Sequence, residues 1–216
     1  FKAVDIVIEC AEKYGMEVHL YDEYPYPSGV AGGEVVLGNP KYHATVLVQE
    51  TYDVQGENIH LTLPRGKILS VIAYPLRKSH VDWSSALDLR QHVGMVLTED
   101  SYIETGLTRY NQKRYFASNP VPTLETILPK GQYRIFASVQ QEIDRFKYWG
   151  SYVDVLNPEA IWEFMRVTHE RYRKRYADKF GSTIVSIFVD ETTPEWSDRI
   201  PEEFVNEYGY DLCPLL

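Results

Sequence analysis

The chain has few cysteines, an excess of acidic over basic residues and no long apolar run. Two of its 216 residues, Cys10 and Cys213, are cysteines, which excludes a disulfide framework and a cysteine-rich zinc site. Lysine and arginine number 22 against 31 aspartates and glutamates, and the net charge of -9 argues against nucleic acid and membranes as partners. No apolar run reaches the ~18–20 residues that a membrane-spanning helix needs.

Tyrosine is abundant: 17 residues are Tyr, and aromatic residues make up 13% of the chain. A tyrosine ring offers a flat apolar face and a hydroxyl group, which suits a surface that binds sugars by stacking and hydrogen bonding. Tyrosine also favours β-strands. Packing within a sheet therefore explains any single tyrosine equally well.

The first and last parts of the chain have the pattern of an α/β protein. Apolar residues at helical spacing predict a helix from Lys2 to Tyr14, with Gly15 as its left-handed cap and Cys10 on its buried face. Asn157 followed by Pro158 is a favoured helix start. The further predicted elements are a strand at Glu17–Glu23, a loop at Tyr24–Gly33, a helix from Pro158 to about Lys179, a strand at Thr183–Val189 and a helix at Pro201–Tyr208.

The middle of the chain reads as strands joined by short turns, which favours an antiparallel β-sandwich or jelly roll. The predicted strands are Ala44–Glu50, Asn58–Leu63, Lys67–Tyr74 and Gln132–Val139. We therefore predict an α/β fold in three segments: 1–41 and 148–216 form part of a (β/α)8 TIM-barrel-like domain, and 42–147 form an inserted antiparallel β-sandwich. A closed barrel needs about 250 residues, so only part of one fits. The helical pattern begins at Phe1, without a Met, and we expect a piece of a longer protein whose remainder, or a second copy, is a partner.

Two Asp-Glu pairs follow the predicted buried strands, Asp22-Glu23 and Asp190-Glu191. The C-terminal end of a parallel strand is where α/β enzymes place their chemistry, and cleavage of a glycosidic bond needs two carboxyl groups. We predict Glu23 and Glu191 as the catalytic pair. Because side chains alternate along a strand, Asp22 and Asp190 point away from them and are predicted to contact substrate or a metal ion. Capping of the strand ends explains these residues equally well.

Aromatic residues near the predicted strand ends supply candidate sugar contacts. Prolines and glycines give the loop at Tyr24–Gly33 a fixed shape, and the predicted substrate-binding residues beside the two aspartates are Tyr24, Tyr26, Trp149 and Trp196. Asp154 stands just before a helix and is predicted to stabilise a loop. His169 stands within a helix, where packing or hydrogen bonding is expected.

Several of these segments resemble the catalytic barrel of glycoside hydrolase family 106, the α-L-rhamnosidases. The matching segments are Leu20–Glu23, Tyr26–Gly29, Ala31–Gly33, Val153–Ala160, Thr168–Tyr172, Phe188–Glu191 and Tyr208–Leu212. The resemblance implies a barrel with β-rich insertions, hydrolysis of a terminal deoxysugar with inversion, a nearby calcium ion, no organic cofactor, and a secreted or periplasmic location. Glu23 and Glu191 match the family's acidic strand ends, with neither assigned as acid or base.

The sequence thus predicts a glycosidase that acts on an oligosaccharide or glycoside. Two alternatives stay open: a carbohydrate-binding protein without catalysis, for which the β-rich segment and the tyrosines argue, and a barrel fragment without activity, because a partial barrel leaves strand edges unpaired.

Overall fold

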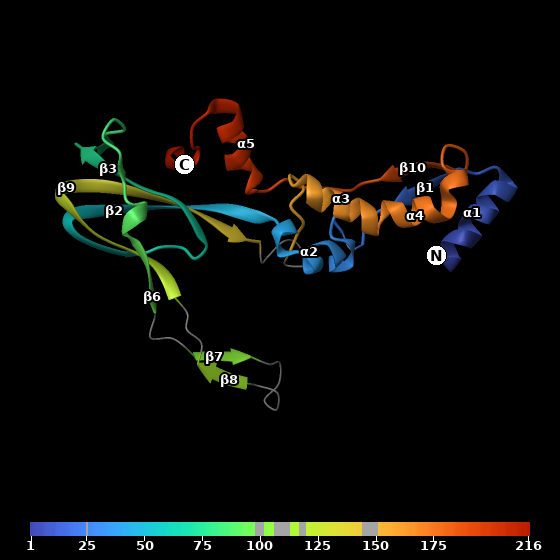
Figure 1. Cartoon of the computed structure of the whole chain (residues 1–216), viewed down its shortest axis with the longest axis horizontal. Coiled ribbons are helices and arrows are strands. Elements are labelled where there is room, and N and C mark those ends of the chain that lie inside the picture. Colours follow the sequence, from blue (N-terminus) through green and yellow to red (C-terminus); the bar gives the residue numbers. More distant parts are fainter. Residues whose placement is uncertain (25, 98–101, 106–112, 117–119, 144–150) are drawn as a thin grey trace. The chain divides into compact units, whose positions relative to one another are not determined.

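The structure, a computed structural model, describes residues 1–24, 26–97, 102–105, 113–116, 120–143 and 151–216 (Figure 1). The chain divides into two compact units. The first unit consists of Phe1–Val46 and Glu142–Ile200, and the second consists of Leu47–Gln141 and Pro201–Leu216. Among the described helices, none combines the length and the apolar character needed to cross a membrane.

The first unit contains two short parallel strands and most of the helices. Gly15 ends the first helix at φ 64°, as predicted. The predicted helix from Pro158 is interrupted at Thr168, whose hydroxyl donates a hydrogen bond to the Phe164 carbonyl at 2.6 Å. The elements are α1 (Lys2–Tyr14), β1 (Val18–Tyr21), η1 (Ala31–Gly33), α2 (Glu34–Gly38), η2 (Pro40–Tyr42), α3 (Pro158–Val167), α4 (His169–Tyr176), η4 (Ala177–Lys179) and β10 (Ile184–Phe188), and α5 (Arg199–Tyr208) begins at the end of this unit.

Strands β1 and β10 pair in parallel and bury one face against α1 and α4. The buried cluster there comprises Ile8, Leu20, Tyr176 and Ile184. The predicted burial of Cys10 was wrong, because α1 buries Ile8 and Ala11 whereas Cys10 is exposed. A second cluster, built around α2 and α3, includes Val35, Tyr152, Val153 and Phe164.

The second unit is a six-stranded sheet with the strand order β2-β9-β3-β4, in which β5 pairs with β3 and β6 pairs with β9. Strands β7 and β8 pair separately with each other. The elements are β2 (Thr45–Thr62), β3 (Lys67–Arg77), β4 (His80–Val81), β5 (Leu87–Asp88), η3 (Arg90–His92), β6 (Val93–Leu97), β7 (Tyr102–Thr105), β8 (Lys113–Phe116), β9 (Pro120–Glu142) and η5 (Cys213–Leu215).

The two long strands change face midway, which lets one sheet enclose a core. In β2, the residues facing the core are Tyr52 and Val54 before Gly56, and Ile59 and Leu61 after it. This switch from even to odd positions marks a bulge, where a strand bends and twists. Strand β9 switches in the same way, from Leu124 and Leu128 to Tyr133, Ile135 and Ala137.

The predicted fold class was wrong. The described residues form mostly antiparallel sheet with few helices, and among them the regular alternation of strands and helices that a TIM barrel requires is absent. The pairs of β3 with β4, β5 and β9, of β6 with β9 and of β7 with β8 are all antiparallel. The middle of the chain forms one six-stranded sheet with two long bulged strands, where we had predicted short strands in a sandwich.

Candidate functional site

The acidic ends of β1 and β10 lie side by side. Tyr21 is the register partner of Phe188, so Glu23 and Asp190, each two residues further on, project toward the same face. The Tyr21 hydroxyl contacts both carboxylates, with Asp190 Oδ2 at 2.5 Å and Glu23 Oε2 also within hydrogen-bonding distance. These hydrogen bonds, that to Asp190 first, raise the pKa of the Tyr21 phenol. We call Tyr21, Glu23 and Asp190 the acidic edge.

Glu191 takes a different direction from Asp190. Its backbone has a φ of 40°, a left-handed conformation that ends the alternation of an extended strand. Its carboxylate accepts a hydrogen bond from the Tyr26 hydroxyl. The structure therefore brings Glu23 together with Asp190 through Tyr21, and brings the predicted residues Tyr26 and Glu191 together as a second pair.

Ser28 joins the two strand ends, although the sequence pattern had not indicated it as a site residue. Its backbone N–H donates to the Asp190 carbonyl at 3.1 Å, and its hydroxyl accepts from the Asp190 N–H at 2.9 Å. The same hydroxyl donates to Asp22 Oδ1 at 2.6 Å, and the Tyr152 hydroxyl donates to the Ser28 carbonyl at 2.8 Å. Burial raises the pKa of Tyr152 to about 12, so the phenol remains a donor at neutral pH. This fully buried serine fixes the acidic edge.

Asp22 is directed away from the acidic edge and toward His169. Its side chain is only 2% exposed, and Oδ2 lies 3.0 Å from His169 Nε2 but does not have the geometry of a hydrogen bond. His169 Nδ1 contacts the Thr168 hydroxyl at 2.8 Å. The helix break at Thr168 thus places the imidazole beside Asp22. The contact with the Thr168 hydroxyl agrees with the hydrogen-bonding role expected of His169. Both side chains line an open, largely apolar cavity of about 470 Å³ between α3 and the segment after β10.

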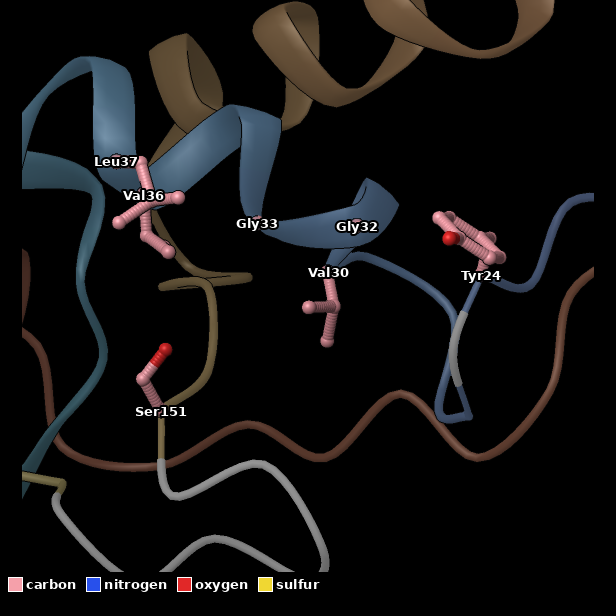
Figure 2. Close-up of a pocket in the computed structure, with 7 residues that line it drawn as sticks. All are labelled: Tyr24, Val30, Gly32, Gly33, Val36, Leu37 and Ser151. Carbon is pink, nitrogen blue, oxygen red and sulfur yellow. The ribbon is translucent and has the colours of Figure 1, made fainter. Parts of the chain in front are cut away.

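Tyr24 lines two smaller hollows. The residue is 74% exposed, and its ring lies against Gly32, where a Cβ atom would come within 2.7 Å of the ring. Figure 2 shows the hollow of about 280 Å³ that extends from Tyr24 toward Leu37 and Ser151. The other hollow, of about 190 Å³, is lined by Tyr21, Asp22, Glu23 and Tyr24 together with residues of α4. It is the cavity that Glu23 of the acidic edge faces.

The remaining predicted residues are distributed elsewhere. Trp149 lies outside the described residues. The Trp196 carbonyl accepts hydrogen bonds from the backbone and hydroxyl of Thr45, which places Trp196 beside the start of β2. Asp154 is buried and accepts hydrogen bonds from the Leu156 N–H and the Ser197 hydroxyl. The predicted loop-stabilising role of Asp154 is confirmed.

Within the described ranges, no group of three or more His, Cys, Asp or Glu side chains is arranged to hold a metal ion. The calcium ion implied by the sequence resemblance therefore stays a prediction.

Comparison of the chain with protein-family models and with curated proteins found no match in either case.

Proposed function

We propose that the acidic edge hydrolyses a glycosidic bond, with Glu23 and Asp190 as the two carboxyl groups. The observation that carries the proposal is the single phenol oxygen of Tyr21 between them. The two carboxylate oxygens both contact this phenol oxygen, so the distance between them is at most the sum of two hydrogen-bond lengths. This upper limit is close to the ~5–5.5 Å that separates the carboxyl groups of a retaining glycosidase. This separation favours retention, whereas the sequence resemblance implies inversion.

Tyr21 suits a pair that must hold one proton. A phenol has one hydrogen to donate, so it satisfies both contacts when it donates to one carboxylate and accepts from the other carboxyl group. A retaining cycle needs this state: the protonated group gives its proton to the leaving oxygen, and the ionised group attacks the anomeric carbon. Water then breaks the glycosyl-enzyme bond, and its proton returns to the first group.

The hollow beside Glu23 favours an uncharged sugar. Glu34, in its lining, is paired with Arg171, whose guanidinium Nη2 lies 2.5 Å from Glu34 Oε2. The acidic edge repels anions, and the exposed ring of Tyr24 offers an apolar surface to a sugar ring. We therefore propose a neutral terminal glycoside, and the sequence resemblance makes an α-L-rhamnoside the first to test.

Hydrolysis of a panel of 4-nitrophenyl glycosides, including the α-L-rhamnoside, tests the proposal. Glu23→Gln and Asp190→Asn should each lower kcat by about 10²–10⁴-fold, the contribution of a positioned acid or base. Glu191→Gln is the matched control and should stay within about tenfold of the parent protein, because Glu191 bonds to Tyr26. Proton NMR of the first product should show the anomeric configuration of the substrate.

Three results would contradict the proposal. They are no turnover of any glycoside by the unaltered chain, equal loss in all three variants, and a product of inverted configuration. Loss in Glu191→Gln with activity retained in Asp190→Asn would point instead to the pair predicted from the sequence.

A further inference from the structure

The outer face of the six-stranded sheet carries a group of aromatic and polar side chains, of which Trp83 is the most exposed aromatic residue. Val71, Ala73, Ile135 and Ala137 point into the core of the second unit. Their neighbours in β3 and β9 therefore point outward, and the register pairs Tyr74 with Arg134 and Ile72 with Phe136 on that outer face.

Three aromatic rings cluster on this face. The Tyr74 and Trp83 ring centroids are 5.0 Å apart, those of Trp83 and Phe136 are 5.7 Å apart, and those of Tyr74 and Phe136 are 5.9 Å apart. Trp83 nevertheless remains 65% exposed. Tyr74 and Phe136 are half-buried beneath it. An exposed indole forgoes much of the stabilisation that burial would give, at about 25 cal/mol per Å² of apolar surface. An exposed indole that two further rings support is therefore a candidate stacking surface for a ligand.

The turn that carries Trp83 is held in one conformation by its neighbour Asp82. The Asp82 carboxylate accepts hydrogen bonds from the backbone and hydroxyl of Ser84, at 3.3 and 2.6 Å, and from the Ser85 hydroxyl at 3.2 Å. It also pairs with Arg77 at 2.7 Å. The exposed ring thus belongs to an ordered turn, and a ligand would bind it with little loss of conformational freedom.

A polar hollow of about 370 Å³ lies on the same face, adjacent to the rings. Arg134, the cross-strand partner of Tyr74, lines it and forms two hydrogen bonds of 2.7 Å with Asp53 of β2. The pairing leaves the hollow without a net charge from these two groups. The lining residues are Asp53, Val54, Gln55, Leu76, Ser79, Gln132 and Arg134.

We propose that this outer face, comprising the aromatic cluster and the polar hollow, binds a neutral saccharide. A pyranose ring has an apolar face that stacks on an indole, and hydroxyl groups that bond in pairs to planar carboxylate, guanidinium and amide groups. The cluster supplies the stacking surface, and Asp53, Gln132 and Arg134 supply the planar groups. The mutual neutralisation of Arg134 and Asp53 and the net charge of -9 disfavour an anionic ligand.

This binding site goes beyond the proposed hydrolysis, because it belongs to the second unit and uses none of the acidic edge. Affinity electrophoresis of the chain through gels that contain dextran, xylan or galactomannan tests this binding site. A gel that contains heparin tests binding to a polyanion for comparison. We expect at least one neutral polysaccharide to retard the chain. Trp83→Ala should raise the dissociation constant by about three- to tenfold, the contribution of one aromatic stacking contact. Trp162→Ala is the matched control, because Trp162 is 68% exposed on α3 of the other unit.

Arg134→Lys gives a second variant that keeps the charge but loses the paired geometry, and it should also weaken retardation. Circular dichroism shows whether each variant is folded. The proposal would be overturned by absence of retardation in every neutral polysaccharide, by equal losses in Trp83→Ala and Trp162→Ala, or by retardation in heparin alone. The two proposals fail separately: Glu23→Gln should leave retardation unchanged, and Trp83→Ala should leave nitrophenyl glycoside turnover unchanged.

Discussion

The acidic edge and the outer aromatic face are constructed in different ways. At the acidic edge, the proposed carboxylates lie just beyond the ends of β1 and β10, and Ser28 of the connecting loop bonds to the Asp190 backbone and to Asp22 beside Glu23. On the outer face, Tyr74, Arg134 and Phe136 lie within strands, and the sheet register holds them, whereas Trp83 lies in the turn that Asp82 stabilises. The acidic edge therefore depends on a few buried polar groups, whereas most of the outer face depends on the backbone path of the strands.

Replacement of a buried serine should have the largest effect and should destabilise the first unit only. Ser28→Ala removes the hydroxyl bonded to Asp22 and to the Asp190 N–H, and it should lower the free energy of unfolding of the first unit by about 3 kcal/mol, because a buried carboxylate and an amide lose a partner. The matched variant is Ser70→Ala, since the Ser70 hydroxyl of β3 is buried without a hydrogen bond. It should have no effect or a slight stabilising effect.

Amide hydrogen exchange during urea titration, followed in peptides from β10 and from β3, reports each unit separately. Equal destabilisation by the two serine variants would refute the role assigned to Ser28.

The second unit should instead be destabilised when a side-chain atom is added where two backbone segments pack closely. A Cβ atom at Gly56 would lie 2.0 Å from the Pro129 carbonyl oxygen, at the point where both long strands change face. Gly56→Ala should therefore destabilise the sheet by about 2 kcal/mol, as overpacking does. Gly94→Ala is the control, because nothing lies within 4 Å of its Cβ position, and it should change stability by less than about 0.5 kcal/mol. Exchange in β2 peptides measures both, and similar values for the two would contradict the proposed bend.

Local signals in the sequence were sufficient to predict many of the elements. Helix α1 with its Gly15 cap, the start of α3 at Asn157-Pro158 and the strand before Asp190 all match the predictions closely. Each depends on residues only a few positions apart, such as a cap or an apolar repeat. The break at Thr168 was missed because the helical pattern continues through it.

Register and long-range contacts could not be predicted from the sequence. The choice of Asp190 over Glu191 as the partner of Glu23 follows from the pairing of Tyr21 with Phe188 and from the left-handed backbone at Glu191. Ser28 acts on Asp190, which lies 162 residues away in sequence. The sequence pattern could place acidic residues after two strands, but only the pairing of those strands decides which two carboxylates meet.

The smallest predicted effect concerns exposed ion pairs, one in each unit. Arg175 and then Tyr176 donate hydrogen bonds to Asp5 and lower its pKa to about 2. A carboxyl group with a lowered pKa in the folded state stabilises that state above its unfolded value of 3.8 and loses this contribution as the pH falls toward 2. Asp5→Asn should therefore lower the melting temperature at pH 7 by no more than about 4 °C, and the difference should vanish between pH 4 and pH 2. A difference for Asp5→Asn that persists at pH 2 would show that packing, rather than charge, joins α1 to α4.

Asp53→Asn removes the partner of Arg134 in the second unit. It should also lower the melting temperature at pH 7, and amide exchange should become faster in β2, whereas Asp5→Asn should make it faster in α1.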